Sequence, residues 1–565
     1  MSQKKVFYIV LGTMLLLSSI VVWYVLMLSI AKIPGGYWFD FSFIDYLSSG
    51  QLDLKKPALI SLSIVCGFLA LIIILIVAPK NRLFGNARWA NWLEIMSYGY
   101  LEKKGGLILG QAKGRLLRSI GPKHLSLSAE PRSGKTVSCV IPNLLSWNKS
   151  SVAVDIKGEL TEITSGYRSQ FQDVYLFNPL GEKNDSHCIN VFDHLAKDEY
   201  EALTQIQTIA HQFIPDVSGK EGIWFSGARN IFIGTALFLR ETGQHLSFGS
   251  IYQWVNEGDC RYRMYCALLQ FSELSKPCKT AFKKHINAEP TKVAPGFLSE
   301  FNTRMEPFSN PKIAAATDKS DFDFKDLRTG NMSVYLICMP NHIGVLGRLL
   351  GIIIEQMLYA ITSRIPTKDE KGSVLFMLDE FTALGKLNQV RKGAAFLGGY
   401  GIRMAMIFQN QHQVFSTYGR DEGNELLALA QERIVFATSE QDDAEKYSRE
   451  LGNLTVKRSS RSYSGGHLSR SISDAGKPLM TPDEIRRLSK KKQIIFGTNQ
   501  RPIKCKKIIY YKDRRFKHKL LAPFNGIPQL YFMEYDFIEL DEPKKADQKT
   551  IDLEKALENL DDDIL

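Results

Sequence analysis

Two long apolar segments without any charge stand near the start of the chain. Residues 6–30 and 58–78 hold twenty-five and twenty-one consecutive uncharged positions. A helix of about 20 apolar residues spans the hydrocarbon core of a bilayer. The pattern therefore predicts two transmembrane helices joined by a loop at 31–57. A cleaved signal peptide is the alternative for the first segment, and its length disfavours that alternative.

Charges on either side of these segments predict their orientation. Lys4 and Lys5 precede the first segment, and Lys80, Arg82 and Arg88 follow the second. The connecting loop balances three lysines against three aspartates. Because positive residues favour the cytoplasmic side, both termini are expected in the cytoplasm and the loop in the periplasm.

Short apolar runs in the remaining chain predict one open α/β sheet with buried parallel strands. The runs are 124–128, 151–155, 174–177, 333–338, 374–378 and 403–408. Residues 199–317 lack such runs, and their apolar positions recur at helical spacing. An all-helical domain inserted into the α/β domain is therefore expected.

A glycine-containing loop after the first of these strands predicts a phosphate site. The segment matches G-x-x-x-x-G-K-[ST] except that Ala129 replaces the first glycine, which requires only a negative φ there. Backbone N–H groups of such a loop face phosphates, its lysine reaches the β and γ oxygens, and its hydroxyl binds Mg²⁺. A solvated turn is the alternative. The predicted nucleotide-binding residues are Arg132, Ser133, Gly134, Lys135 and Thr136.

Polar residues at the ends of two later strands complete the predicted site. Asp379 and Glu380 follow the run 374–378, and Gln409 follows 403–408. We predict that Asp379 supports Mg²⁺ together with Thr136, that Glu380 polarises the attacking water, and that Gln409 orients this water and senses the γ-phosphate. The catalytic set is thus Glu380, Lys135 and Gln409. Solvated strand ends are the alternative interpretation.

These assignments divide the chain into five parts. Residues 1–80 are the transmembrane region, 81–198 the first part of a nucleotide-binding domain, 199–317 the helical insert, 318–530 the second part, and 531–565 an acidic tail.

Charge is distributed unevenly over these parts. The net charge is +12, but the tail from residue 534 carries twelve acids and four lysines, and residues 486–519 carry fourteen basic residues against one acid. The basic stretch suits DNA, the inner leaflet of a membrane, or simple solvation. The tail could dock a basic partner, fold back on this stretch, or be disordered. Residues 459–473, rich in Ser, Gly and Arg, predict a loop. The eight cysteines form no C-x-x-C pair and predict reduced thiols without a metal site or disulfides.

The ordered motifs resemble the coupling proteins of type IV secretion systems, the TraG/TraD class. The matching segments are Asp155-Ile-Lys-Gly-Glu159, Phe177-Asn-Pro-Leu180, Ile223-Trp-Phe-Ser-Gly-Ala-Arg229, Leu378-Asp-Glu-Phe381 with Leu384-Gly385, Gln409-Asn-Gln-His-Gln413, Met480-Thr-Pro-Asp-Glu-Ile-Arg-Arg-Leu488 and Ile509-Tyr-Tyr-Lys512.

This resemblance implies an inner-membrane ATPase with a RecA-like P-loop NTPase domain, two transmembrane helices, and ATP and Mg²⁺ as ligands. It further implies a homohexamer that recruits a relaxase with single- or double-stranded DNA, or effector proteins, to inner-membrane components of the secretion system, in contact with membrane lipid. Because such sites lie between subunits, an arginine acting in trans is expected, with Arg391 and Arg403 as candidates. A docking receptor with structural ATP binding and an FtsK-like membrane DNA translocase are the alternatives.

Overall fold

The computed structural model describes residues 20, 23–25 and 83–541, apart from 104, 218, 330, 368–373 and 465–466. The two predicted membrane spans and their loop lie almost wholly outside these residues and stay predictions. The chain divides into two compact units, residues 1–84 with 457–474 and residues 85–456 with 475–565. The second unit contains the sheet and is described first.

One mixed sheet of eleven strands organises this unit. Its strands are β1 (Leu107–Ala112), β2 (Arg115–Ser119), β3 (Leu125–Ser128), β4 (Ser151–Asp155), β5 (Asp173–Phe177), β6 (Met332–Ile337), β7 (Val374–Leu378), β8 (Ile402–Phe408), β9 (Glu432–Val435), β12 (Lys492–Gly497) and β13 (Ile503–Lys506). Their order is β2-β1-β13-β12-β9-β3-β8-β7-β4-β6-β5. Neighbours from β9 to β5 are parallel, and those from β9 to β2 are antiparallel. The six predicted strands are all confirmed.

Both faces of the parallel strands are buried, as their continuous apolar sequences predict. Along β4, Val152 and Val154 belong to one hydrophobic cluster, whereas Ala153 between them belongs to another. Arg168, fully buried beside the second cluster, donates hydrogen bonds to three carbonyl oxygens of residues 144–149 and to Ser333 Oγ. These bonds fix the layer that follows the phosphate loop against the sheet.

Helices flank the sheet, and all but the first and the last lie between its strands in sequence. They are α4 (Trp92–Ser97), α5 (Ile141–Leu144), α6 (Glu159–Arg168), α14 (Asp326–Thr329), α15 (Ile343–Thr362), α16 (Asn388–Leu397), α17 (Gln411–Tyr418), α18 (Arg420–Ala428), α19 (Gln441–Leu451), α20 (Pro482–Arg486) and α21 (Arg514–Lys517). Pro340–Thr362 is the one segment of the described chain long and apolar enough to cross a membrane, yet most of it is buried in the protein. It is therefore a core helix.

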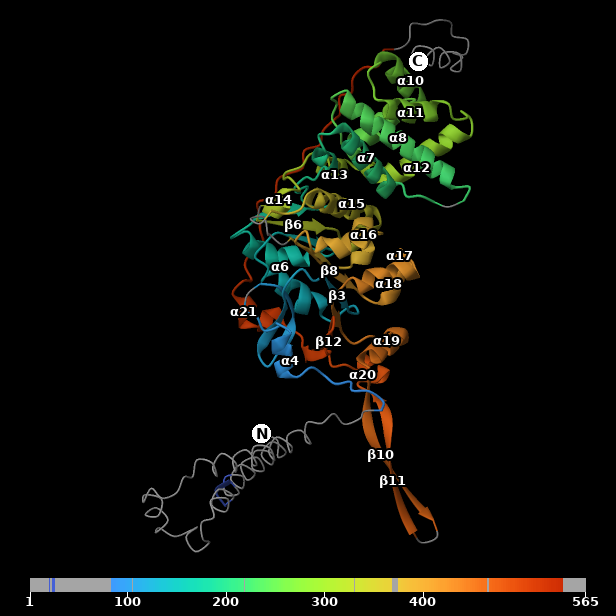
Figure 1. Cartoon of the computed structure of the whole chain (residues 1–565). Coiled ribbons are helices and arrows are strands. Elements are labelled where there is room, and N and C mark those ends of the chain that lie inside the picture. Colours follow the sequence, from blue (N-terminus) through green and yellow to red (C-terminus); the bar gives the residue numbers. More distant parts are fainter. Residues whose placement is uncertain are drawn as a thin grey trace, which may run out of the picture. The chain divides into compact units, whose positions relative to one another are not determined.

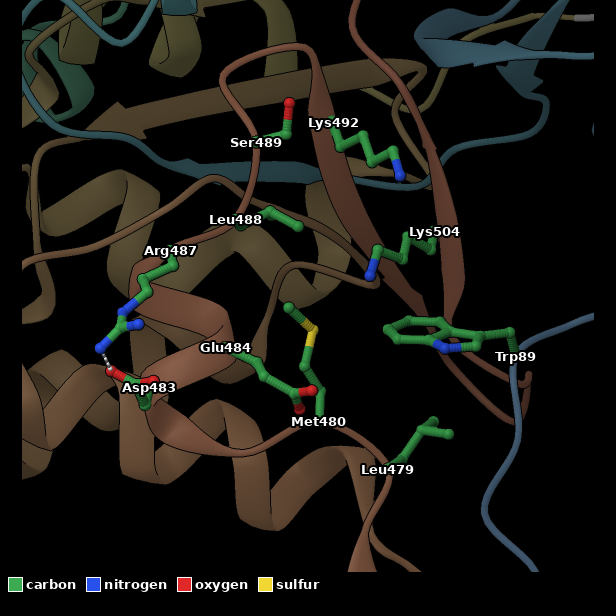
Figure 2. Close-up of a pocket in the computed structure, with 10 residues that line it drawn as sticks. All are labelled: Trp89, Leu479, Met480, Asp483, Glu484, Arg487, Leu488, Ser489, Lys492 and Lys504. Carbon is green, nitrogen blue, oxygen red and sulfur yellow. Dashed lines mark ion pairs between the residues drawn. The ribbon is translucent and has the colours of Figure 1, made fainter.

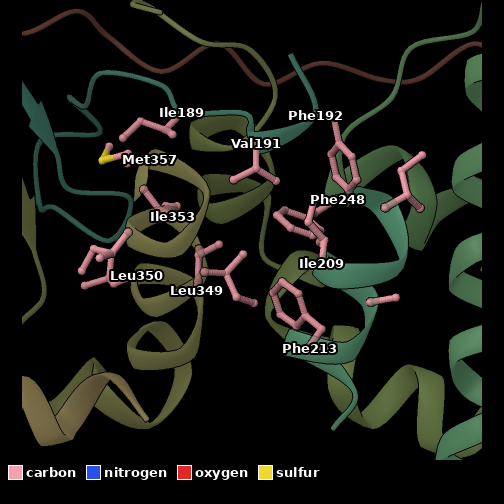
Figure 3. Packing of buried hydrophobic residues seen from close by; sticks show 14 of the residues in the cluster. Ile189, Val191, Phe192, Ile209, Phe213, Phe248, Leu349, Leu350, Ile353 and Met357 are labelled. Atoms are coloured by element: carbon pink, nitrogen blue, oxygen red, sulfur yellow. The ribbon is translucent and has the colours of Figure 1, made fainter. Parts of the chain in front are cut away.

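The segment between β5 and β6 is helical and gathers at one end of this unit (Figure 1). Its helices are α7 (Glu199–Phe213), α8 (Gly222–Glu241), α9 (Phe248–Asn256), α10 (Cys260–Gln270), α11 (Lys276–Ile286), α12 (Val293–Met305) and α13 (Pro311–Ala316), and its described residues form no strand. Figure 3 shows Phe213 and Phe248 of this segment facing Leu349 of α15. They share one hydrophobic cluster with the sheet, so these helices have no separate core.

Glu355 links the helical segment to the sheet layer through buried polar contacts. Its carboxylate on α15 accepts hydrogen bonds from the Gln212 side chain of α7 and, at 2.8 Å, from the backbone N–H of Gln389 in α16. Burial raises the pKa of Glu355 to about 7.

A two-stranded antiparallel hairpin replaces the loop predicted at 459–473. Its strands are β10 (Asn453–Ser464) and β11 (His467–Pro478). The loop prediction was wrong because it rested on the Ser and Gly content alone and overlooked a strand pattern in the same residues. Serines alternate here with larger side chains, a strand pattern, and Gly465-Gly466 is a typical hairpin turn sequence.

Residues 519–541, here called the C-terminal strap, run in extended form along the second unit to the helical segment (Figure 1). Phe524 N–H donates to Ser165 Oγ at 3.0 Å, and Leu530 N–H donates to the Asn184 carbonyl at 2.8 Å. Near its end, the Tyr535 hydroxyl donates to Asp318 at 2.9 Å. Thus the described start of the predicted tail lies along the protein, and residues 542–565 lie outside the described residues.

Candidate functional site

The carboxyl ends of four neighbouring parallel strands open into one cleft of about 790 Å³. The four are β3, β8, β7 and β4, and ligands of open α/β sheets bind at such edges. The cleft is lined by the phosphate loop, the two carboxylates after β7 and the glutamine after β8. The predicted residues lining it are Arg132, Gly134, Lys135, Thr136, Asp379, Glu380 and Gln409. Ser133 of the loop is not among the lining residues.

The loop after β3 has the backbone that its glycine requires. Gly134 has φ +85°, and Arg132 also lies in the left-handed region at φ +59°. Ala129 is buried and has no positive φ, so the missing first glycine does not strain the loop. Thr136 starts a π-helical turn, Thr136–Val140, directly after Lys135. Sequence alone identified this loop despite its departure from the usual pattern.

The side chains of Lys135, Asp379, Glu380 and Gln409 converge across the cleft. The ammonium group of Lys135 lies 3.4 Å from Asp379 Oδ1 and hydrogen-bonds to Glu380 Oε1. Gln409 Nε2 donates to the same Glu380 oxygen at 3.2 Å. The structure therefore brings together, from β3, β7 and β8, the residues predicted to be catalytic.

Two features set the carboxylates after β7 apart from ordinary strand ends. Glu380 has φ +57°, an uncommon backbone conformation for a residue with a side chain. Asp379 Oδ1 is buried and, within the described chain, accepts no hydrogen bond, its neighbour being Lys135. Burial raises the pKa of Asp379, and the charge of Lys135 offsets part of that rise. Asp379 Oδ1 is thus a buried carboxylate oxygen without a hydrogen-bond donor. It and the hydroxyl of Thr136, which follows β3 two strands along the same sheet edge, are the kind of oxygen ligands that Mg²⁺ prefers.

The strand β4 adds residues to the cleft that sequence reasoning quoted only as part of a motif. Asp155 is buried and accepts hydrogen bonds from Thr161 N–H at 2.8 Å and Thr161 Oγ1 at 2.9 Å. Lys157 and Glu159 line the cleft beside it. A signal was available, since the fully buried strand ends in Asp155 and two more charged residues, Lys157 and Glu159, follow within four positions.

A lysine from the basic stretch supports the phosphate loop. Lys507 Nζ donates to the Ser133 carbonyl oxygen at 3.0 Å and lies 3.1 Å from the centre of the Phe436 ring. Burial lowers the pKa of Lys507 to about 7. Sequence reasoning counted this residue among the fourteen basic residues of 486–519 and left DNA, membrane and solvent open as their surroundings. Its contacts with Ser133 and Phe436 set it apart from the others, and hydropathy does not show which lysines pack inward.

The two arginines predicted to act in trans occupy different environments. Arg403 is buried on β8, where it donates to the Ser119 carbonyl and stacks on Trp147 at 5.2 Å. Its burial speaks against a role at a neighbouring subunit. Arg391 on α16 lies 3.7 Å from Glu422 and 3.5 Å from Glu425. In neither case does the described chain place the guanidinium among the residues that line the cleft.

The expectation of reduced thiols also bears on the site chemistry. Seven described cysteines are buried. Among the described residues no group of three or more His, Cys, Asp or Glu could hold a metal ion. The described residues that line the cleft include the loop, two carboxylates and an amide, and no cysteine.

The sequence of this chain is similar to a known protein family and to individual proteins. The family model described as "Type IV secretory system Conjugative DNA transfer" matches residues 84–528. Protein VirD4 of Rhizobium rhizogenes is 30% identical over 486 residues, which cover 83% of this chain and 72% of that protein. Conjugal transfer protein TraG of Escherichia coli is 25% identical over 505 residues, 79% of each chain.

A solved structure shows the same fold. The plasmid coupling protein TrwB in complex with ADP and Mg²⁺ matches with a TM-score of 0.57 at 16% identity, over 79% of this chain and 99% of that one. The RecA-like P-loop NTPase fold predicted from the sequence is therefore confirmed.

Proposed function

The chain belongs to the conjugative DNA transfer family of type IV secretory systems, and from that premise we propose that it is an inner-membrane ATPase that couples cargo to the secretion channel. The cargo class is a nucleoprotein, relaxase with attached DNA, or a protein effector. The family description and the name of TraG, a conjugal transfer protein, support a role in conjugative transfer. TrwB, described as a plasmid coupling protein in complex with ADP and Mg²⁺, supports the coupling role and nucleotide binding.

We assign the binding of ATP to the loop after β3. Gly134, Lys135 and Thr136 line the cleft where the helical turn begins, a place where backbone N–H groups bind phosphates. The Lys135 ammonium group then reaches the β- and γ-phosphate oxygens. Lys135 then exchanges its carboxylate partners for phosphate oxygens. Mg²⁺, when bound, neutralises developing charge on the phosphates, and Thr136 and Asp379 would hold it.

Hydrolysis is assigned to Glu380 and Gln409. When Lys135 turns to phosphate, Glu380 Oε1 keeps the Gln409 amide as its neighbour at 3.2 Å. A carboxylate and an amide so placed can accept a proton from water and hold its oxygen in line with the γ-phosphorus. This convergence of Lys135, Glu380 and Gln409 is the observation that carries the proposal. It favours turnover over purely structural ATP binding, because a binding-only receptor needs no such pair.

The assembly and location follow from the same premise. We propose a homohexamer anchored by two N-terminal spans at 6–30 and 58–78, with both termini in the cytoplasm. Arg391 is retained as the candidate arginine that acts on a neighbouring subunit. It would have to leave Glu422 and Glu425 for a phosphate, a change that a subunit interface could supply.

Glu380→Gln tests the proposal. We expect ATP hydrolysis by the full chain in lipid nanodiscs to fall by about 10²–10⁴-fold, because the base is lost, while ATP binding persists. Binding is measured with a fluorescent ATP analogue, hydrolysis by phosphate release, and function by conjugation from donor cells. Glu445→Gln removes an exposed carboxylate outside the cleft and is the matched control. Full hydrolysis by Glu380→Gln would contradict the assignment. Absence of hydrolysis in the wild type, with binding and transfer intact, would favour the docking receptor.

A further inference from the structure

A basic and aromatic hollow lies at the antiparallel side of the sheet, away from the nucleotide cleft. It has a volume of about 680 Å³ and lies between β1, β13 and the start of α4. No acidic residue lines it. Its charged and aromatic lining residues are Trp89, Trp92, Lys113, Lys492, Lys504 and Lys506. We call it the lysine-tryptophan hollow.

A smaller hollow of about 350 Å³ adjoins it and shares Trp89, Lys492 and Lys504. Figure 2 shows the two lysine side chains projecting from neighbouring strands toward Trp89. The acids of this smaller hollow have other partners. Asp483 pairs with Arg487 at 3.1 Å, and Glu484 caps α20, although it also lies within electrostatic reach of Lys504.

The backbone brings the lysines together on one exposed face. Lys504 and Lys506 alternate with buried residues along β13, and Lys492 of β12 lies directly opposite Lys506. Like charges in opposed positions of neighbouring strands destabilise a sheet. Within the described chain none of the three forms an ion pair. An anion between them would remove this repulsion.

The aromatic rings and nearby apolar side chains make this site unlike a purely ionic one. Lys504 lies 5.4 Å from the Trp89 ring centre, and Lys113 lies 4.8 Å from that of Trp92. On α4, Leu93 is 70% exposed and Met96 is 50% exposed. Tryptophan with flanking lysines and exposed apolar residues is the composition of a protein surface at the membrane–water interface.

The length of chain after the predicted second span limits how far this surface can lie from the bilayer. The predicted second span ends at Ala78, and Trp89 follows eleven residues later. An extended chain advances at most about 3.6 Å per residue, so Trp89 can lie no more than about 40 Å from the end of the span.

We propose that the lysine-tryptophan hollow binds the phosphate groups of anionic phospholipids in the cytoplasmic leaflet. Lys492, Lys504 and Lys506 hold the phosphates, while Leu93 and Met96 reach the acyl boundary. The inference rests on the membrane anchoring proposed above. It favours lipid over DNA because exposed Leu93 and Met96 have no role in tracking a nucleic-acid backbone, whereas a short tether to the bilayer gives them one.

Full-length protein in nanodiscs tests this proposal. One disc contains phosphatidylcholine alone, and the other adds about 30% phosphatidylglycerol, which makes its surface anionic. Each lysine near an anionic surface strengthens binding by about fivefold. Hydrogen exchange is measured on peptides covering residues 88–97 and 503–507. We expect exchange at least about fivefold slower in the anionic disc. The triple variant Lys492→Gln, Lys504→Gln, Lys506→Gln should lose this difference.

The matched control changes the same charge elsewhere. Lys276, Lys284 and Lys292 are exposed on the helical segment, and their replacement by Gln should keep the protection. Equal protection in both discs would overturn the proposal, because another segment of the chain would then cover the hollow. Protection by duplex DNA or by inorganic phosphate in place of phosphatidylglycerol would overturn it too, as would failure of the chain to enter discs.

ATP hydrolysis is recorded in every sample and separates this inference from the proposed function. Both triple variants should retain wild-type basal hydrolysis in neutral discs, because neither lies at the cleft. Normal hydrolysis without lipid-dependent protection would reject the lipid site alone.

Discussion

The nucleotide cleft and the C-terminal strap differ in how their polar contacts are distributed. The cleft gathers Lys135, Asp379 and Glu380 at one point, with like carboxylates side by side and Glu380 in an uncommon backbone conformation. The strap spreads well-formed single hydrogen bonds over residues 519–541. A functional site tolerates local strain that a fastening segment has no reason to carry. We therefore expect the cleft to determine turnover and the strap to determine stability.

The largest effect is expected from loss of the Gln409 amide. Gln409→Ala should lower ATP hydrolysis by about 10²-fold, because water is no longer held beside Glu380, and should leave the unfolding temperature unchanged. Phosphate release and differential scanning calorimetry on the same sample measure both. Gln441→Ala, an exposed amide on α19, is the control. A lower unfolding temperature with normal hydrolysis would contradict the expectation that the cleft determines turnover and not stability.

At the strap we expect the opposite result, a loss of stability with hydrolysis unchanged. Tyr535 stacks on His245 with ring centres 5.7 Å apart and donates to Asp318. Tyr535→Ala should destabilise the attachment of the strap by about 1–3 kcal/mol through the lost packing and hydrogen bond, with basal hydrolysis retained. Hydrogen exchange of residues 531–541 measures the change. Tyr531→Ala serves as control because that ring is 78% exposed. Unchanged exchange in Tyr535→Ala would show that the strap is held elsewhere.

The strap should also respond to pH. The hydrogen bond to Asp318, at 2.8 Å, raises the pKa of His245 above its ordinary value of 6.5. The stabilisation is complete below pH 6.5 and is lost as pH rises through the raised pKa. Exchange of residues 531–541, corrected for intrinsic rates, should therefore be slower at pH 6 than at pH 8. His245→Gln should show the same corrected exchange at both values, and a persistent difference in this variant would assign the effect to another group.

A second pH dependence is expected at Glu355, which joins the helical segment to the sheet layer. Its folded-state pKa of about 7 exceeds the ordinary 4.5, so the folded protein holds an extra proton between these values. Stability should therefore fall as pH rises from 4.5 to 7. Glu355→Gln should reduce that slope while weakening the contacts to Gln212 and Gln389. Urea unfolding across this range measures the slope. An unchanged slope would show that the proton is held by another residue.

Elements defined by local pattern were predictable from the sequence, and elements defined by distant partners were not. The six strands follow from short apolar runs, and the loop at Lys135 follows from spacing that phosphate geometry imposes. The strap has no periodicity because each residue meets a different partner, and Tyr531–Met533, strand-like in sequence, forms no strand. The inward position of Lys507 likewise depends on Phe436 and Ser133, which are remote in sequence.

Within the site, residue identity was predictable but mutual geometry was not. Nothing in the sequence places Gln409 and Lys135 on the same oxygen of Glu380, because that depends on β8 lying between β3 and β7. In the basic stretch at 486–519, residues that are close in sequence lie in different environments. Its residues look continuous in sequence, yet Lys492 and Lys506 line a hollow, Lys507 lies beneath the phosphate loop and Arg515 pairs with Asp513.

The position of β13 in the sheet has a consequence for how the chain is made. β1 and β2 join the sheet only through β13, which ends at Lys506. A ribosome delivers β1 nearly four hundred residues earlier, counting from Ala112 to Ile503. During that interval of synthesis the first hairpin has no partner strand, and its open edge needs protection. Premature termination between Ser119 and Ile503 would thus leave a translation product in which the first hairpin has an unpaired β-edge, a natural substrate for chaperones and proteases.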